Sequence, residues 1–193
     1  MNSRLLTDLA LAPLAGYVGT KIMEPVSSKL YELESEQDRR REDEARPGVP
    51  YAIAARKAAD LLGLRLSDKQ RERLALAFHY GLATQWAPLY PLLRRQTSLG
   101  PVAAGLTAGA AMSLVTDEMM TPALGFSAPN RACPLSTHLR DLVGHLVFGL
   151  GVAAVTETGW RLCGNGPEVA DRDNTQAADT ASAIYKRPLA FYL

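Results

Sequence analysis

The chain has 193 residues and a formal net charge of +1. This balance excludes a typical nucleic-acid-binding protein, because no basic surface is left uncompensated by acidic residues. Two cysteines, Cys133 and Cys163, are too few for a disulfide framework or a four-cysteine zinc site. Most of the charged residues lie in residues 32–73 and after residue 164, and long stretches elsewhere carry few charges.

Residues 5–25 form the first predicted transmembrane helix. The segment is apolar over about 20 residues, which is the length that crosses a bilayer at 1.5 Å per residue. Asp8 and Lys21 lie near its two ends, where charged side chains can reach the membrane interface. Pro13 is expected to bend this helix.

Residues 26–73 are highly charged and are predicted to form a helical linker. Glu36 and Arg40, for example, lie four residues apart in the orientation that stabilises a helix. We expect a solvated helical extension of the first span or, alternatively, an arm that docks a protein partner. Ser67, with Gln70 three residues later, predicts a capping box that starts the next helix.

Three further spans are predicted in residues 74–93, 99–120 and 138–158. Gly105 and Gly109 lie four residues apart in the third span and mark a smooth face of small residues. Another helix of the bundle, or a second copy of the chain in a homo-oligomer, can pack closely on such a face.

The predicted fold is all-α. Residues 1–163 are expected to form a membrane-embedded bundle of four transmembrane helices with a helical charged extension, surrounded by the lipid bilayer. Apolar core helices of a soluble protein are the alternative, but near-uncharged segments of bilayer length are hard to solvate. Residues 164–193 are polar and small, which predicts a flexible tail.

Four spans place particular helix ends on the same side of the membrane. The first span ends there, the second begins, the third ends and the fourth begins. Titratable side chains occur at each of these ends, and we predict that they form one polar cluster: Lys21, Glu24, His79, Asp117, Glu118, His138, Asp141 and His145. An ionised group at mid-membrane costs about 2.5–3.5 kcal/mol, so such groups usually face the bundle interior and have partners. The cluster would suit a proton or a cation, although a polar plug that holds the bundle together would give the same pattern.

His79, His145 and one acidic residue could also form a three-ligand metal site. No HExxH or CxxC pattern supports such a site, and the chain has no phosphate-binding Gly-rich loop and no G-x-S-x-G motif. Cys133 has no evident base partner, which disfavours hydrolase chemistry. The sequence implies no cofactor and no catalytic residue, and it leaves the metal content open.

A family resemblance rests on motifs in the second half of the chain. They are His79 early in a span, a Pro-x-x-Gly turn in residues 122–129, and Gly-His-Leu-Val at residues 144–147. With these motifs the chain resembles the YagU-like family of bacterial inner-membrane proteins. Residues 32–46 and the Asp117-Glu118 pair depart from that family, so the chain looks like a distinct branch. The resemblance implies a multi-pass protein of the bacterial inner membrane, and it carries over no reaction, cofactor or catalytic residue.

The distribution of Lys and Arg indicates an orientation. Most of these residues near span ends lie in the linker of residues 26–73, so the positive-inside rule makes the linker cytoplasmic and places both termini outside. In either orientation Cys133 and Cys163 fall on opposite faces of the membrane and cannot pair.

Three functions remain open from the sequence. The polar cluster could bind or conduct a proton or cation, or the chain could be a structural or accessory membrane subunit that docks a partner through its charged arm. A metal-dependent membrane enzyme is the third function, and the sequence favours it least.

Overall fold

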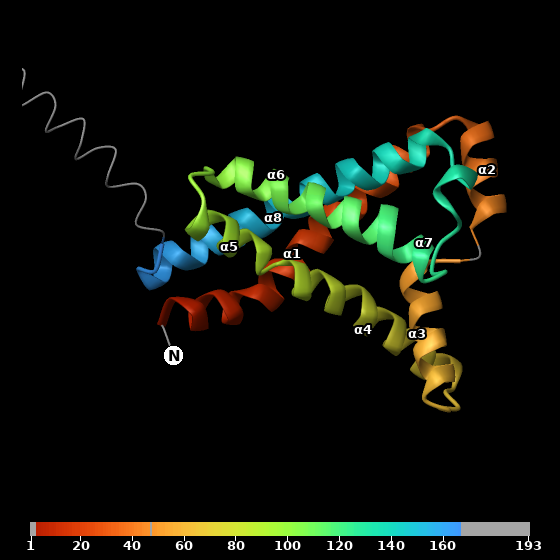
Figure 1. Ribbon diagram of the computed structural model, residues 1–193, viewed down its shortest axis with the longest axis horizontal. Coiled ribbons are helices and arrows are strands. Elements are labelled where there is room, and N and C mark those ends of the chain that lie inside the picture. Colours follow the sequence, from red (N-terminus) through yellow and green to blue (C-terminus); the bar gives the residue numbers. More distant parts are fainter. Residues whose placement is uncertain (1–2, 47, 167–193) are drawn as a thin grey trace, which may run out of the picture.

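The computed structural model describes residues 3–46 and 48–166, and this part of the chain contains helices and no strands. The all-α prediction is therefore confirmed. Long helical segments lie alongside one another, and the two short helices α2 and α3 lie at one end of them (Figure 1). The tail expected from residue 164 onward falls almost wholly outside the described residues.

Helix α1 runs from Ser3 to Leu33 without interruption, passing through Pro13 and Pro25. The predicted helical extension of the first span continues in α1 to Leu33, and a separate helix, α2 (Glu36–Ala45), follows. The hydroxyl of Ser35 accepts a hydrogen bond from the Asp38 amide at 3.1 Å and caps this new helix. Helix α3 (Pro50–Leu61) follows.

Helix α4 (Asp68–Trp86) begins at the predicted capping box, where the Ser67 amide donates to the Gln70 side chain at 2.9 Å. The apolar stretch continues in a second helix, α5 (Leu89–Gln96). Pro88 separates the two helices, because its ring cannot donate the backbone hydrogen bond that a continuous α-helix needs. The predicted second span thus consists of two helices.

Helix α6 (Pro101–Met112) continues directly into the π-helix η1 (Ser113–Met120) and the short α7 (Thr121–Ala123). After the turn and the 3-10 helix η2 (Asn130–Ala132), α8 runs from Leu135 to Cys163. The π-helix is the unexpected element. Such wide turns are rare and occur frequently at functional sites.

Helix α8 packs against both α1 and α6, and glycines make the closest contacts. A Cβ atom on Gly105 would lie 2.9 Å from the carbonyl oxygen of Gly149, and one on Gly109 would overlap the carbonyl of His145. The Gly105/Gly109 face, which the sequence offered for another helix or a second copy, is therefore covered by α8 of the same chain.

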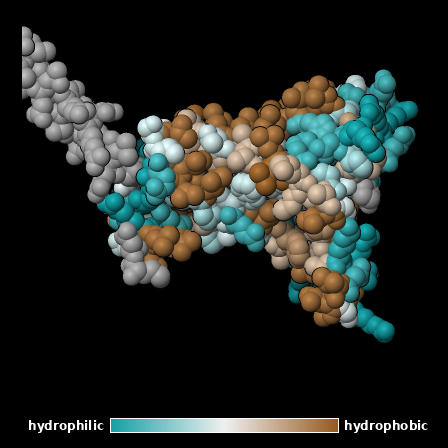
Figure 2. Space-filling view, viewed as in Figure 1, coloured by the Kyte–Doolittle hydropathy of each residue, from teal (hydrophilic) through white to brown (hydrophobic). Residues whose placement is uncertain are grey.

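Alanine is the most frequent apolar residue in the interior, which also holds Tyr90, Phe148 and Trp160, whereas many large apolar side chains lie on the outside. The buried residues include Ala12, Ala15, Ala83, Ala104 and Ala153. Residues more than a third exposed include Leu9, Leu14, Ile22, Val102, Leu114 and Leu150. Figure 2 shows the hydrophilic residues gathered mainly over α2 and α3 and near the end of α8, with hydrophobic surface between them.

Among the described residues, α8 alone is a helix long and apolar enough to cross a membrane. The second predicted span is divided between α4 and α5, the third consists of α6 and η1, and the long α1 carries several charged residues. The four-span bundle therefore stays a prediction.

Candidate functional site

A cavity of about 650 Å³ opens between the helices at the end of the bundle where α3 and α4 meet α8. Its wall carries both apolar side chains and charged groups, the latter being Arg46, His79, Asp117, Asp141 and His145. The volume lies in the range of pockets that hold small organic ligands. The topological argument from the sequence predicts that these helix ends meet, and they do so here.

Asp117 and His145 face each other across the contact between η1 and α8. The Asp117 Oδ2 atom lies 3.1 Å from His145 Nδ1, which also lies 2.8 Å from the carbonyl oxygen of Asp141. Because a carbonyl only accepts, Nδ1 carries the hydrogen and Nε2 is the free ring nitrogen. That hydrogen is directed at the Asp141 carbonyl, so the buried Asp117 Oδ2 has no hydrogen-bond partner. A proton or a cation could satisfy it.

His79 belongs to a second group on the cavity wall. Its Nε2 atom lies 3.4 Å from Glu24, which is bound at 2.8 Å by the Lys21 ammonium. The imidazole also contacts the ring of Tyr51, with 4.6 Å between centroids. Lys21 and Glu24 are both more than a third exposed, so this group links the cavity to the outer surface of the bundle.

Arg46 reaches the cavity from the charged segment. Its guanidinium lies 2.9 Å from Glu42 and 3.6 Å from Asp141, and Asp141 lies 3.6 Å from Arg140. These two contacts of Asp141 are too long for hydrogen bonds. Asp141 is thus a loosely paired carboxylate on the cavity wall.

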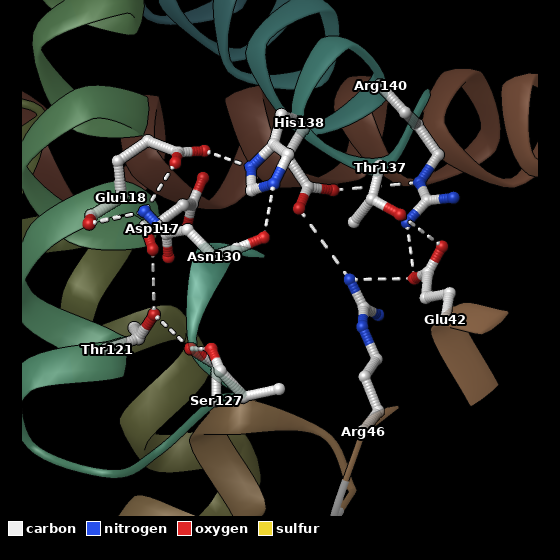
Figure 3. A network of polar contacts seen from close by, with 12 residues as sticks. Glu42, Arg46, Asp117, Glu118, Thr121, Ser127, Asn130, Thr137, His138 and Arg140 are labelled. Carbon is white, nitrogen blue, oxygen red and sulfur yellow. Dashed lines mark hydrogen bonds and ion pairs between the residues drawn. The ribbon is translucent and has the colours of Figure 1, made fainter. Parts of the chain in front are cut away.

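Glu42 holds α2 onto α8 through a buried network (Figure 3). The Glu42 side chain is only 1% exposed and accepts hydrogen bonds from Arg140 at 2.6 Å and Thr137 at 2.8 Å. Arg140 also binds Glu34 at 2.6 Å. The expectation that this charged segment is merely solvated is therefore wrong for Glu34 and Glu42, which are buried against α8.

The pKa values of Glu34 and Glu42 shift in opposite directions. Burial raises the pKa of Glu34, whose Oε2 has no hydrogen-bond partner. Burial also acts to raise the pKa of Glu42, but the hydrogen bonds from Arg140 and Thr137 outweigh it and leave this pKa below its usual range.

Glu118 and His138 form a separate pair that does not line the cavity. His138 Nδ1 lies 2.7 Å from the Glu118 carboxylate, and the side-chain amide of Asn130 donates a hydrogen bond to the same carboxylate at 2.8 Å. Figure 3 shows this pair beside Asn130 and apart from the contacts of Arg46 with Glu42. Its hydrogen bonds tie the loop before α8 to η1, which indicates a structural role.

The predicted cluster therefore divides into linked groups. Four of its members, His79, Asp117, Asp141 and His145, share the cavity wall. Lys21 and Glu24 contact the cavity through His79, whereas Glu118 and His138 lie apart. In residues 3–46 and 48–166, no three His, Cys, Asp or Glu side chains are grouped so as to hold a metal ion.

Sequence reasoning missed Arg46, Glu42 and Thr116. Arg46 and Thr116 line the cavity, and the buried Thr116 hydroxyl has no hydrogen-bond partner. The only available signal was the position of Arg46 just before the Pro-Gly break, and it did not distinguish this arginine from its charged neighbours.

A second polar cluster lies at the opposite end of the bundle. Asp8 binds Arg95 at 2.8 Å and accepts from the Trp160 indole at 2.7 Å, and Glu157 binds Arg94 at 2.8 Å. These contacts join α1, α5 and α8. Cys133 and Cys163 flank α8 at its two ends, and both are free thiols.

Comparisons with protein-family models, curated proteins and solved structures found no match to this chain.

Proposed function

We propose that the chain is a multi-pass membrane protein that binds a proton or a cation in the cavity lined by Asp117 and His145 and conducts it across the membrane. The observation that carries this proposal is the buried, unpartnered Asp117 oxygen beside His145, inside a bundle whose outer surface is apolar.

The distribution of side-chain size supports the membrane setting. A soluble bundle buries its large apolar residues, whereas helices in lipid associate through small residues and leave large ones on the outside. Here alanine and glycine lie at the closest helix contacts, together with a few large residues such as Phe148 and Trp160, whereas Leu9, Leu14 and Leu150 are exposed.

The spacing of charges supports the same setting. At 1.5 Å per residue, the uncharged stretch of α8 from Asp141 to Glu157 is about 24 Å long, and that of α1 from Asp8 to Lys21 is about 20 Å. Charged groups at both ends can extend to the interfaces of a hydrocarbon core of about 30 Å. We propose that α1, α4 with α5, α6 with η1, and α8 are the spans.

The cation chemistry follows from the unequal pairing of the carboxylates. Both oxygens of the Glu42 carboxylate accept hydrogen bonds within the protein, so Glu42 has little capacity left to bind a cation. Asp117 has an oxygen with no hydrogen-bond partner, and Asp141 has only long contacts with its arginines. His145 can pass a proton between its free Nε2 and the cavity, because its Nδ1 is held by the helix backbone.

The proposal is tested by proton flux into vesicles. Protein reconstituted in liposomes that contain a pH-sensitive dye should acidify the interior faster than protein-free liposomes after an acid pulse. Asp117→Asn and His145→Gln should each abolish the difference. His138→Gln, a matched change of a histidine off the cavity wall, should retain it. Flux equal to that of protein-free liposomes would refute the proposal, as would full flux in both cavity variants.

The resemblance to the YagU-like family and the bacterial inner membrane belong to this proposal as well. In the proposed arrangement α2 and α3 lie on the cytoplasmic side, together with the open end of the cavity.

A further inference from the structure

We propose that the cavity is a binding site for an apolar organic cation, such as an alkyl- or arylammonium ion, with its charge between Asp117 and Thr116. This inference rests on the membrane setting and the cavity of the proposed function, and it names the class of ligand that the cavity takes.

The walls of the cavity are unsuited to a bare metal ion. Apolar side chains make up most of them, among them Met23, Leu82, Met112, Phe78 and Phe148. A hydrated inorganic cation has no apolar surface to bury against such walls, whereas an organic cation gains binding free energy by burying its apolar groups there. Phenylalanine rings also attract a desolvated cation through their faces.

Two unsatisfied polar atoms indicate where the charge of the ligand would lie. The Thr116 side chain is 2% exposed and lines the cavity, and its hydroxyl has no hydrogen-bond partner. Asp117, the next residue, also lines the cavity, and its buried Oδ2 has no hydrogen-bond partner. Unpaired buried polar groups are costly and therefore uncommon. Both residues belong to the π-helix.

The charge balance of the wall favours a cation over an anion. Two carboxylates, Asp117 and Asp141, line the cavity with one guanidinium, that of Arg46. Arg46 is bound closer to the buried Glu42, at 2.9 Å, than to Asp141, at 3.6 Å. The carboxylates on the wall thus outnumber the guanidinium, and this excess would disfavour an anionic ligand.

The test compares two ions of the same shape and opposite charge. Protein in lipid nanodiscs is titrated with tetraphenylphosphonium and, separately, with tetraphenylborate, and binding to empty nanodiscs is subtracted. Tetraphenylphosphonium should bind at one site per chain, and tetraphenylborate should bind much more weakly. Equal or tighter binding of the borate, or no saturable binding of the phosphonium, would overturn the inference.

Substitutions test whether the charge of the bound cation lies beside Asp117 and Thr116. Asp117→Asn should weaken phosphonium binding about tenfold or more, as expected for loss of one charged interaction in a desolvated site. Glu118→Gln, which changes the neighbouring carboxylate off the cavity wall, should leave binding unchanged. Thr116→Val keeps the side-chain shape and removes an unsatisfied hydroxyl, so the protein should stay folded while binding weakens. Unchanged binding in both Thr116→Val and Asp117→Asn would overturn the inference.

The two proposals fail separately. Proton flux without phosphonium binding would leave the proposed function standing and remove this inference. Phosphonium binding that depends on Asp117, without proton flux, would support this inference and remove the proposed function.

Discussion

Arg140 binds two buried glutamates whose hydrogen bonding is unequal. Every oxygen of Glu42 has a partner, because Arg140 and Arg46 share one and Thr137 donates to the other. Glu34 has one oxygen bound by Arg140 and one with no partner. A buried charge stabilises a fold only when it is paired and its remaining lone pairs are satisfied. Glu42 meets that condition and Glu34 does not.

Glu42→Gln should therefore destabilise the protein by about 3 kcal/mol at pH 7, the lower end of the cost of removing one partner from a buried pair. Glu34→Gln should have little effect or should stabilise the protein, because it removes a poorly satisfied charge. Unfolding of the two variants in mild detergent measures the difference. Glu36→Gln, on the exposed face of α2, is the matched control and should behave like the parent.

Acid should change the stability contributions of Glu42 and Glu34 in opposite directions. The lowered pKa of Glu42 means that its contribution to stability is complete above its usual value of 4.5 and is lost as the pH falls through the lower folded value. The raised pKa of Glu34 means that its ionised form costs stability at neutral pH, and the cost disappears as the pH falls. Between pH 7 and pH 4, unfolding free energies should show the benefit of Glu34→Gln shrinking. A benefit that grows on acidification would contradict this account.

At the scale of whole elements, the crossing of α6 and α8 sets the position of the cavity. Gly105 and Gly109 let the α6 backbone touch α8 at Gly149 and His145. The same contact sets His145 opposite Asp117, which lies in the π-helix that follows α6. Close packing of the two helices and the geometry of the site thus depend on the same residues.

Gly109→Ala should lower the unfolding free energy by about 1–3 kcal/mol, the usual cost of overpacking, because its Cβ would overlap the His145 carbonyl. It should also reduce proton flux by moving His145. Gly81→Ala in α4 is the matched control. A Cβ there meets open space, so the substitution should be neutral or should stabilise the helix by about 0.5–1 kcal/mol. Equal stability of the two variants would argue against the close crossing.

At the scale of the whole molecule, charged groups occupy both ends and an uncharged region separates them. Asp8 with Arg95 and Glu157 with Arg94 lie at one end, and the network around Glu42 lies at the other. Large apolar side chains cover the outside of the region between them. In water this apolar surface would promote aggregation, whereas in a bilayer it would contact the lipid tails.

Leu14→Lys tests which solvent meets that surface. Leu14 is 55% exposed in the uncharged middle of α1. In a bilayer a lysine near the helix centre costs about 2.5–3.5 kcal/mol, so the variant should insert poorly and be recovered less in the carbonate-washed membrane fraction. Leu33→Lys, 73% exposed at the end of α1, is the matched control and should insert normally. Normal insertion of both variants, or recovery of the parent in the soluble fraction, would contradict the membrane setting.

The sequence by itself determined the helical class, the capping box at Ser67 and the meeting of His79, Asp117 and His145 at one end. These features depend on local chemistry and on the alternation of chain direction, both of which can be read along the chain. The four-span interpretation came from the same apolar stretches, and it stays a proposal.

Only the tertiary structure decided which charges pair. The charged segment looks uniformly solvated along the sequence, yet the turn at Ser35 folds α2 back so that Glu42 reaches Arg140, a residue far away along the chain. The π-helix is likewise not evident in the sequence, and in it Thr116 Oγ1 and Asp117 Oδ2 have no hydrogen-bond partner. Pairing and its absence depend on distances between helices, and no local pattern in the sequence encodes those distances.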